Sequence, residues 1–189
     1  MRAGSFEDRT KKDLDRALRQ RLDRDPLERI RVRELTELCG IRRQSFYYHF
    51  PDVPALFSWS LERETESLLA RRELCLTWQQ ALADLVRHIG ENRRYYQALL
   101  ADRGREGLAA TLSLRPLLER TLTYYRRRGG ESPPDEASLE CWETLVVTLL
   151  ESWIRQDLPQ PPEALLALLE DTLRQGAAGA AWQNPAART

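Results

Sequence analysis

Apolar residues recur along this chain every three to four positions, the spacing that places them on one face of an α-helix. The first predicted helix begins at Thr10, which can cap it, and ends before Pro26, because a residue that precedes proline avoids the helical conformation. Its apolar face consists of Leu14, Ala17, Leu18 and Leu22. No stretch alternates apolar and polar residues with the period of two that marks a strand, so the pattern predicts an all-α fold.

Two short helices and a long one are predicted next. The short helices cover Val32–Leu38 and Arg42–Tyr48, with a break at Gly40 between them. The long helix runs from Pro51 to about residue 78, with Pro51 in its first turn. Further helices are expected over Trp78–Leu100, Leu108–Arg127, Leu139–Ile154 and Glu163–Leu173.

Proline and glycine interrupt this pattern at several places. A helix break is expected at Arg103–Gly107, a loop at Arg126–Glu136, and another break at residues 158–162. The tail from Gly176 is rich in alanine and glycine and is expected to fray. The prediction is therefore about nine helices: a three-helix head over residues 1–58, a linking helix over about 51–78, and a helical bundle body over residues 59–189.

Composition narrows the class of protein. The chain is 42% apolar and 31% charged, and no run approaches the roughly 18 to 20 apolar residues that a membrane span needs. The first residues are charged and hold no apolar segment typical of a secretory signal, so we expect a cytoplasmic protein without membrane contact. Three cysteines, Cys39, Cys75 and Cys141, lie too far apart for a zinc motif, and we expect no disulfide, metal or cofactor.

Charge is distributed unevenly, although the net charge is zero. Residues 1–49 hold 13 Lys and Arg against 9 Asp and Glu, a net +4, and the remainder is correspondingly −4. A basic head on an acidic body is expected when one end of a protein meets phosphate. An excess of four charges is small, and chance would explain it equally well.

The segment Arg31–Phe50 carries the strongest functional signal. Two short helices flank the Gly40 turn, and the residues with the spacing to pack them together are Leu35, Leu38, Ile41 and Phe46. The second helix is left with arginine, glutamine, serine and tyrosine on its outer side, which are types that read bases and hold phosphates. This pattern predicts a helix-turn-helix, whose second helix enters the major groove.

The alternative is a solvated, charged helix face without a ligand. The aromatic cluster Phe46-Tyr47-Tyr48-His49-Phe50 argues against it, because solvent alone does not explain so many aromatic residues beside two arginines.

The same residues resemble the TetR/AcrR family of bacterial transcriptional regulators. The similarity lies in a first helix, then Ile30-x-Val32 with Leu35, Gly40-Ile41, and the run Ser45–Asp52 followed by Leu56, and it covers about residues 9–62. Within the family, the segment Arg43–Phe50 is most similar to the branch of activators of dihydroxyacetone kinase operons.

The resemblance implies roles for individual positions. Residues near base edges would be Arg43, Gln44 and Ser45, with Arg42 as a possible extra contact. Tyr47 and His49 would hold phosphates, Tyr48 could do either, and Thr10 and Lys11 would touch the DNA backbone. The buried residues would be Phe46, Phe50 and Leu56.

Three positions depart from the family pattern. Val53 stands where a phosphate-binding lysine is common, so one DNA contact is expected to be missing. Arg31 and Arg42 stand where small capping residues are usual, and a missing cap costs about 1 kcal/mol of helix stability.

The resemblance also implies a dimer whose body receives a signal. The predicted dimer interface consists of Leu139, Trp142, Val146, Leu149, Leu150, Leu165 and Leu169; the alternative is that these residues bury one another within one subunit. A pocket for a small effector could be lined by Trp78, His88, Tyr95, Tyr96, Trp142 and Trp153. Ordinary core packing is the alternative for the aromatic residues, and a surface or hydrogen-bonded histidine for His88. A protein co-regulator could take the place of the small effector.

Two other classes of function fit the sequence less well than a DNA-binding regulator does. An enzyme is disfavoured, because the two histidines stand apart from any metal-binding set and no nucleophile or phosphate-loop motif is present. A protein-interaction co-regulator with weak or no DNA binding is favoured only by the low net charge and by Val53. The sequence therefore predicts a DNA-binding transcriptional regulator that acts as a homodimer on double-stranded DNA.

Overall fold

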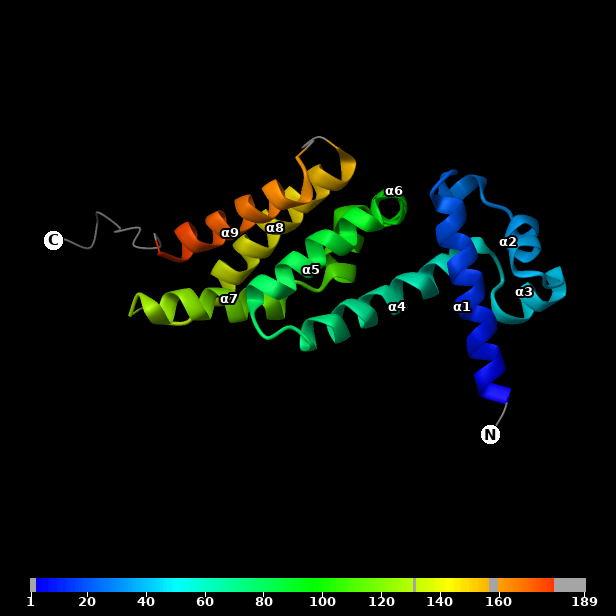
Figure 1. Cartoon of the computed structure of the whole chain (residues 1–189), viewed down its shortest axis with the longest axis horizontal. Coiled ribbons are helices and arrows are strands. Elements are labelled where there is room, and N and C mark those ends of the chain that lie inside the picture. Colours follow the sequence, from blue (N-terminus) through cyan, green and yellow to red (C-terminus); the bar gives the residue numbers. More distant parts are fainter. Residues whose placement is uncertain (1–2, 131, 157–159, 179–189) are drawn as a thin grey trace.

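The computed structural model describes residues 3–130, 132–156 and 160–178, and every regular element within these ranges is a helix. Helices α1–α3 gather at one end of the molecule and α5–α9 form a bundle at the other, with α4 running from one group to the other (Figure 1). The predicted all-α class, with a helical head and a helical body, is confirmed.

The helices in chain order are α1 (Ala3–Leu22), the 3-10 turn η1 (Leu27–Arg29), α2 (Val32–Cys39), α3 (Arg43–His49), α4 (Val53–Glu73), α5 (Trp78–Glu91), α6 (Arg93–Leu112), α7 (Arg115–Arg128), α8 (Glu136–Arg155) and α9 (Pro162–Ala178). Side-chain caps fix three of the starts, and Asp135, which accepts a hydrogen bond from the backbone N–H of Ser138 at 2.9 Å, begins α8. Asp52 accepts a hydrogen bond from the backbone N–H of Ala55 at 2.8 Å and begins α4, and Thr77 accepts one from the N–H of Gln80 at 3.2 Å and begins α5.

Several predicted helix boundaries are wrong. Helix α4 begins at Val53, so Pro51 lies before it and not in its first turn, and the predicted helix over Leu108–Arg127 is divided between the end of α6 and α7. The first helix begins at Ala3, so Thr10 lies inside α1 and does not cap it. Residues 3–9 contain one glycine and no proline, so the helix extends through them. The linking helix α4 ends at Glu73, and Trp78 starts a new helix because the capping pair Thr77 and Gln80 precedes and follows it.

The middle of the chain is divided differently from the prediction. The predicted helix over Trp78–Leu100 is two helices that meet at Asn92. The break expected at Arg103–Gly107 is a kink inside α6, where Gly104 has φ 64° and ψ −161°. Only glycine adopts that conformation readily, so the kink is specified by this one residue.

The body is held together by helices that pack across one another. Helix α8 packs against α6 and α7, and α9 packs against α5 and α7, while α4 contacts α6 at the edge of the bundle. The fully buried side chains at these contacts include Tyr96, Leu99, Leu108, Leu150, Trp153, Leu165 and Leu169. Apolar burial of this kind is the main source of stability for helices of this length.

The end of the chain is described only in part. Helix α9 continues to Ala178, beyond the predicted end at Leu173. The tail that we expected to fray from Gly176 lies outside the described residues from position 179 onward, as do positions 157–159 of the predicted proline-rich break. No described helix combines the length and the apolar character that spanning a membrane requires.

Candidate nucleic-acid interface

The head is a small cluster of α1, α2 and α3 closed by the start of α4. Its interior is formed by apolar side chains that are almost fully buried: Leu14, Leu18, Leu22, Ile30, Leu35, Phe46, Phe50 and Leu56. Seven of these, all except Ile30, were placed in the core by the spacing of apolar residues or by the family resemblance. Leu38 was also expected to face inward, but it is 49% exposed: it lies in the last turn of α2, which the rest of the head leaves uncovered although the spacing puts Leu38 near the Leu35 face.

The turn between α2 and α3 depends on Gly40. Its φ of 64° and ψ of 29° lie in the left-handed region, which glycine adopts without a steric penalty. The N–H of Ile41 donates to the carbonyl of Thr36 at 3.0 Å and completes the end of α2. The chain therefore reverses sharply, and α3 begins three residues after the glycine.

Helix α3 has one buried side and one exposed side. Phe46 is fully buried, while Arg43, Gln44, Tyr47 and Tyr48 are exposed, the two tyrosines by 56% and 73%. Two neighbouring aromatic side chains exposed to this extent on one short helix are unusual, and exposed apolar surface of this kind often marks a binding site. The buried ring therefore holds the helix in place while its other face remains available for a partner.

Arg42 and Arg43 differ from other cations of the head in what surrounds them. Within the described part of the chain, neither of them forms an ion pair, and both are exposed. Arg16 lies 3.0 Å from Asp13, and Arg33 lies 2.6 Å from Glu37, so acidic neighbours neutralise these two. The N-terminal end of α3 thus presents two adjacent exposed cations that no acidic neighbour neutralises among the described residues.

Aromatic contacts support α3 from its C-terminal end. The ring of Phe50 lies 5.7 Å from that of Trp59 on α4 and 6.1 Å from that of Phe46. The rings of Tyr48 and His49 meet edge to face at 5.0 Å. The exposed tyrosine side chains therefore project from a rigid aromatic support.

The remaining predicted DNA contacts lie at less exposed positions. Ser45 and His49 are half-buried at the sides of α3, and Thr10 and Lys11 are half-buried in the third turn of α1. The structure brings Arg42–His49 together on one helix. It does not place Thr10 and Lys11 at a helix start, which is where the resemblance put them.

The three departures from the family pattern have local explanations. Val53 is only 6% exposed in the first turn of α4, so this position belongs to the core of the head. The backbone N–H of Arg31 donates to Oε2 of Glu34 at 2.9 Å, which satisfies one group at the start of α2 even though arginine cannot accept a capping bond. Arg42 makes no side-chain capping bond to α3.

A buried polar cluster joins the head to the body, and it was not predicted from the sequence. Glu64 of α4 is 3% exposed and accepts hydrogen bonds from Arg19 Nη2 at 2.9 Å and from the hydroxyl of Tyr96 at 2.6 Å. Its Oε1 also lies 2.6 Å from Nε2 of His88. Burial alone would raise the pKa of Glu64, but the bond to His88, the charge of Arg19 and the bond to Tyr96 outweigh it and lower the pKa to about 2.

A second layer surrounds that carboxylate. The hydroxyl of Ser60, which is fully buried, lies 2.9 Å from that of Tyr95 and donates to Asp15. The guanidinium of Arg19 lies 3.9 Å from the centre of the Tyr95 ring. Burial is the first cause of the raised pKa of Tyr95, so this phenol stays neutral in the cluster.

The residues predicted to line an effector pocket fall into separate places. His88, Tyr95 and Tyr96 belong to the cluster around Glu64. Trp78 packs edge to face against Tyr125 at 5.6 Å, and its buried indole nitrogen has no hydrogen-bond partner among the described residues.

The other two tryptophans lie on α8. Trp142 is half-buried at the edge of the core. Trp153 is fully buried, donates to the carbonyl of Gln160 at 2.9 Å, and has the guanidinium of Arg93 4.4 Å from its ring centre. These contacts are those of core residues.

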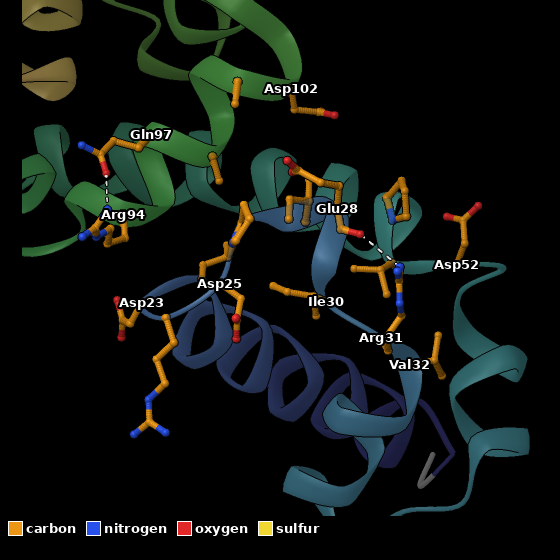
Figure 2. A pocket seen from close by; sticks show the side chains of 18 residues that line it. Asp23, Asp25, Glu28, Ile30, Arg31, Val32, Asp52, Arg94, Gln97 and Asp102 are labelled. Carbon is orange, nitrogen blue, oxygen red and sulfur yellow. Dashed lines mark hydrogen bonds between the residues drawn. The ribbon is translucent and has the colours of Figure 1, made fainter.

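Two cavities are formed by other residues. The larger, of about 790 Å³, lies between the head segment 22–32 with the start of α4 and the first half of α6. Figure 2 shows Ile30 and Asp25 on its head side and Arg94, Gln97 and Asp102 on its α6 side. The smaller, of about 450 Å³, lies between α6 and α8 near Ala109 and Thr144. None of the six predicted effector residues lines either cavity.

The residues predicted for the dimer interface are mainly inside the subunit. The five that are less than a tenth exposed are Leu139, Val146, Leu150, Leu165 and Leu169. Trp142 and Leu149 are half-buried. The buried faces of α8 and α9 meet α5, α6 and α7 and not principally each other. On the outer surface, Leu145 and Leu168 are 38% and 40% exposed.

Potential metal ligands are scattered. Among the described residues, no three or more His, Cys, Asp or Glu side chains gather in a group that could hold a metal ion. The cysteines are free thiols; Cys39 and Cys75 are half-buried, and Cys141 is exposed.

Comparisons with known proteins show which family shares this sequence and fold. A TetR-type family model, described as "Transcriptional regulator C-terminal region", matches residues 76–175, which is more than half of the chain. The HTH-type dhaKLM operon transcriptional activator DhaS of Lactococcus lactis subsp. lactis (strain IL1403) is 29% identical over 90 residues, 48% of this chain and 48% of that protein. The matching part of the chain thus spans about half the length of this curated relative.

Solved structures show the same fold. The dihydroxyacetone kinase operon activator DhaS matches with a TM-score of 0.66 at 20% identity, over 87% of this chain and 93% of that chain. RolR, solved without ligand, matches with a TM-score of 0.57 at 22% identity, over 88% and 95%. The family model and the curated relative both describe transcriptional regulators and not enzymes.

Proposed function

Because the chain belongs to the TetR family of transcriptional regulators, we propose that it binds double-stranded DNA through α3. One observation carries the proposal: the N-terminal end of α3 presents two exposed arginines, Arg42 and Arg43, which pair with no acidic residue in the described part of the chain, beside two exposed tyrosines, Tyr47 and Tyr48. Guanidinium groups bind guanine edges and phosphates, and tyrosine hydroxyls bind phosphates.

Within this proposal the residues divide by position. Arg43, Gln44 and Ser45, in the first turn of α3, are those that read base edges, because the N-terminal part of a recognition helix enters the groove first. Tyr47 and His49 hold phosphates, and Tyr48 and Arg42 contribute on either side. Thr10 and Lys11, on α1, contact the DNA backbone. Residues 1–58 form the DNA-binding domain, and residues 59–189 form the domain that dimerises and receives the signal.

The dimer is part of the proposal. A helix-turn-helix protein that reads two half-sites needs two heads about one helical turn of DNA apart. Because most of the residues first predicted for the interface are buried in the subunit, the surface available for the partner is the outer side of α8 and α9, where Leu145 and Leu168 are exposed. Trp142 and Leu149, both half-buried, lie on the same helix as Leu145.

Control by an effector completes the proposal. A small molecule or a protein co-regulator would act on the body and change the placement of the head. The relative DhaS is named as an operon activator, and RolR is named with reference to a ligand. Both names are consistent with regulated DNA binding in this chain.

A paired substitution on α3 tests the DNA proposal. The double variant Arg43→Ala, Tyr47→Ala removes one exposed cation and one exposed aromatic residue four positions apart on α3. We expect it to abolish the binding of a fluorescently labelled duplex from the region upstream of the protein's own gene, measured by anisotropy, and to leave the circular dichroism spectrum unchanged.

The chain supplies a matched control. Arg120 and Tyr124 on α7 are also an exposed arginine and an exposed tyrosine four positions apart, and they lie outside the head. Arg120→Ala, Tyr124→Ala changes the net charge by the same amount and should leave DNA binding intact. If both double variants bound DNA as the wild type does, α3 would not be the recognition helix.

A further inference from the structure

We propose that Glu64 is a positioning residue of the head: its buried carboxylate holds α1 against the body and thereby fixes the direction in which α3 points. The consequence for DNA binding rests on the proposed function. The joint itself is a property of the protein alone, and it can be tested without DNA.

Three helices converge on this one side chain. Arg19 comes from α1 of the head, His88 from α5 and Tyr96 from α6, and all three lie within 2.9 Å of the Glu64 carboxylate oxygens. Glu64 itself belongs to α4, the helix that runs from the head into the body (Figure 1). The carboxylate is therefore a direct link between the head and two body helices.

The burial of Glu64 and Arg19 holds these two side chains in one arrangement. The Glu64 side chain is only 4% exposed and that of Arg19 is 25% exposed, so water cannot easily replace a lost partner. An unpaired buried charge is strongly unfavourable, which forces Arg19 to stay at Glu64 as long as α1 stays in place. The Tyr95 ring against Arg19 and the Ser60 bond to Asp15 fix the same turn of α1.

The opposite side of the head is not packed in this way. The cavity of about 790 Å³ separates segment 22–32 of the head from α6. Its walls carry Arg94 and Asp102 of α6 opposite Asp25 of the head (Figure 2), and no ion pair between head and α6 crosses it among the described residues. The head is thus fastened at Glu64 and faces open space beyond the end of α1, so release of the joint leaves it room to tilt.

The ring of Phe57, which is fully buried, also packs against that of Tyr95 at 5.6 Å, but this apolar contact has no charge that fixes its geometry. A further polar link between head and body is more exposed than the Glu64 cluster. Arg103 of α6 donates to the hydroxyl of Ser58 at 2.6 Å, but the arginine is exposed and also binds Asp102. Exposed contacts of this kind contribute little. This difference in burial is the reason to assign the positioning role to Glu64.

A distance measurement between head and body tests the proposal. Spin labels at the exposed native Cys141 on α8 and at Arg29→Cys in η1 report the separation by double electron–electron resonance, in a background with Cys39→Ser and Cys75→Ser. Labelled protein is diluted with an excess of unlabelled protein so that a dimer contributes no distance between subunits, and the unsubstituted joint should then give one narrow distance. Glu64→Gln should lose that single distance and give a broader or second population.

A second variant covers the case in which Glu64→Gln does not fold. Arg19→Gln removes only the head's part of the joint and leaves Glu64 bound to His88 and Tyr96 within the body. It should broaden the distance in the same way, and Arg19→Lys, which keeps the charge, should restore much of the narrow population. Retention of helix content is checked by circular dichroism.

The matched control breaks an ion pair that lies within the head. Glu34→Gln removes the 2.9 Å contact between Glu34 and Arg21, which joins α1 to α2 and does not involve the body. It should leave the distance unchanged. The proposal is overturned if Glu64→Gln and Arg19→Gln keep the narrow distance, if Arg19→Lys gives no recovery, or if Glu34→Gln broadens the distance equally. Because no DNA is present, failure of DNA binding by the wild type would contradict the proposed function and leave this result standing.

Discussion

At the scale of residues, two arginines of the head show that the same side chain serves opposite purposes. Arg43 is exposed and has no ion-pair partner in the described structure, whereas Arg19 is largely buried against Glu64. The sequence could predict the first, because it stands in a run of polar residues after a turn. It could not predict the second, because its partner lies 45 positions away in the chain.

Glu64 itself left a weak signal in the sequence. It stands within the charged run Glu62–Glu66, which is typical of a solvated helix face. However, it falls seven residues after Phe57 and four before Leu68, both of which are buried, so it occupies a position on the apolar stripe of α4. A charged residue on such a stripe indicates a buried partner, although the partner's identity requires the fold.

The first prediction concerns the stability of the protein in acid. The folded protein lowers the pKa of Glu64 to about 2 from an ordinary value near 4.5, so the ionised form stabilises the fold. This contribution is fully present above about pH 4.5 and is lost as the pH falls toward 2. Glu64→Gln lacks it at every pH, and an uncharged amide beside Arg19 and His88 leaves those donors poorly satisfied.

Urea unfolding at a series of pH values measures this effect. At pH 7 we expect Glu64→Gln to lower the free energy of unfolding by about 3 kcal/mol, the usual range for breaking one buried pair. The difference between wild type and variant should shrink between pH 4.5 and 2. A difference that stays constant over this range would show that the Glu64 charge does not stabilise the fold.

At the scale of elements, capping and glycine positions explain where the predicted helices were wrong. The helical period alone predicted one helix from Pro51 to about residue 78. The cap formed by Thr77 and Gln80 instead starts a separate helix, α5, at Trp78. Helix starts without a clear cap were harder to predict, as the start of α1 shows, because Thr10 looked like a cap and lies in mid-helix. Gly40 was identified as a break, Gly104 lies in the break expected at Arg103–Gly107, and both glycines have positive φ.

The second prediction compares these two glycines. A methyl group at either position would meet no atom within 4 Å, so alanine changes only the backbone energy. Gly40, at ψ 29°, lies in the left-handed region that other residues visit at a cost of roughly 1 kcal/mol. Gly104, at ψ −161°, lies in a region that is essentially restricted to glycine.

Thermal unfolding of the two single variants distinguishes these cases. Gly40→Ala should lower the melting temperature slightly. Gly104→Ala should lower it more, with a loss of about 2–3 kcal/mol in the free energy of unfolding, unless α6 straightens to relieve the strain. Equal effects would mean that α6 relieves the strain without loss of stability. Gly90, which has ordinary backbone angles and lies 3.3 Å from Trp153 at the added methyl group, is a control for crowding without strain.

At the scale of the whole molecule, the fold separates the head of α1–α3 from the bundle of α5–α9 and links them through α4 (Figure 1). The charge follows this division, since the first 49 residues are net positive and the rest are net negative. The sequence predicted this arrangement well in the head, where the motif is local. It predicted the body surfaces poorly, because the partners of α8 and α9 are helices that come earlier in the chain.

The third prediction concerns the dimer. Leu145→Glu and Leu168→Glu place charges on the outer side of α8 and α9, and we expect either to shift the protein toward monomer in multi-angle light scattering. Leu74→Glu is the control, because Leu74 is 84% exposed in the connection after α4, away from both helices. If the wild type is already a monomer at micromolar concentration, the dimer proposal is wrong.

The central claim is that the face of α3 around Arg42 and Arg43 binds DNA, and the salt dependence of binding tests it most directly. The wild-type protein is titrated onto a duplex from the region upstream of its own gene at a series of salt concentrations. A protein that neutralises phosphates releases counterions, so log K should fall steeply and linearly with log salt concentration. Because Arg43 is proposed to read a base edge, Arg43→Ala should weaken binding by about 1–3 kcal/mol and relax the preference for one base pair. Absence of binding at low salt, or binding that salt does not weaken, would contradict the account and favour a co-regulator that acts through proteins.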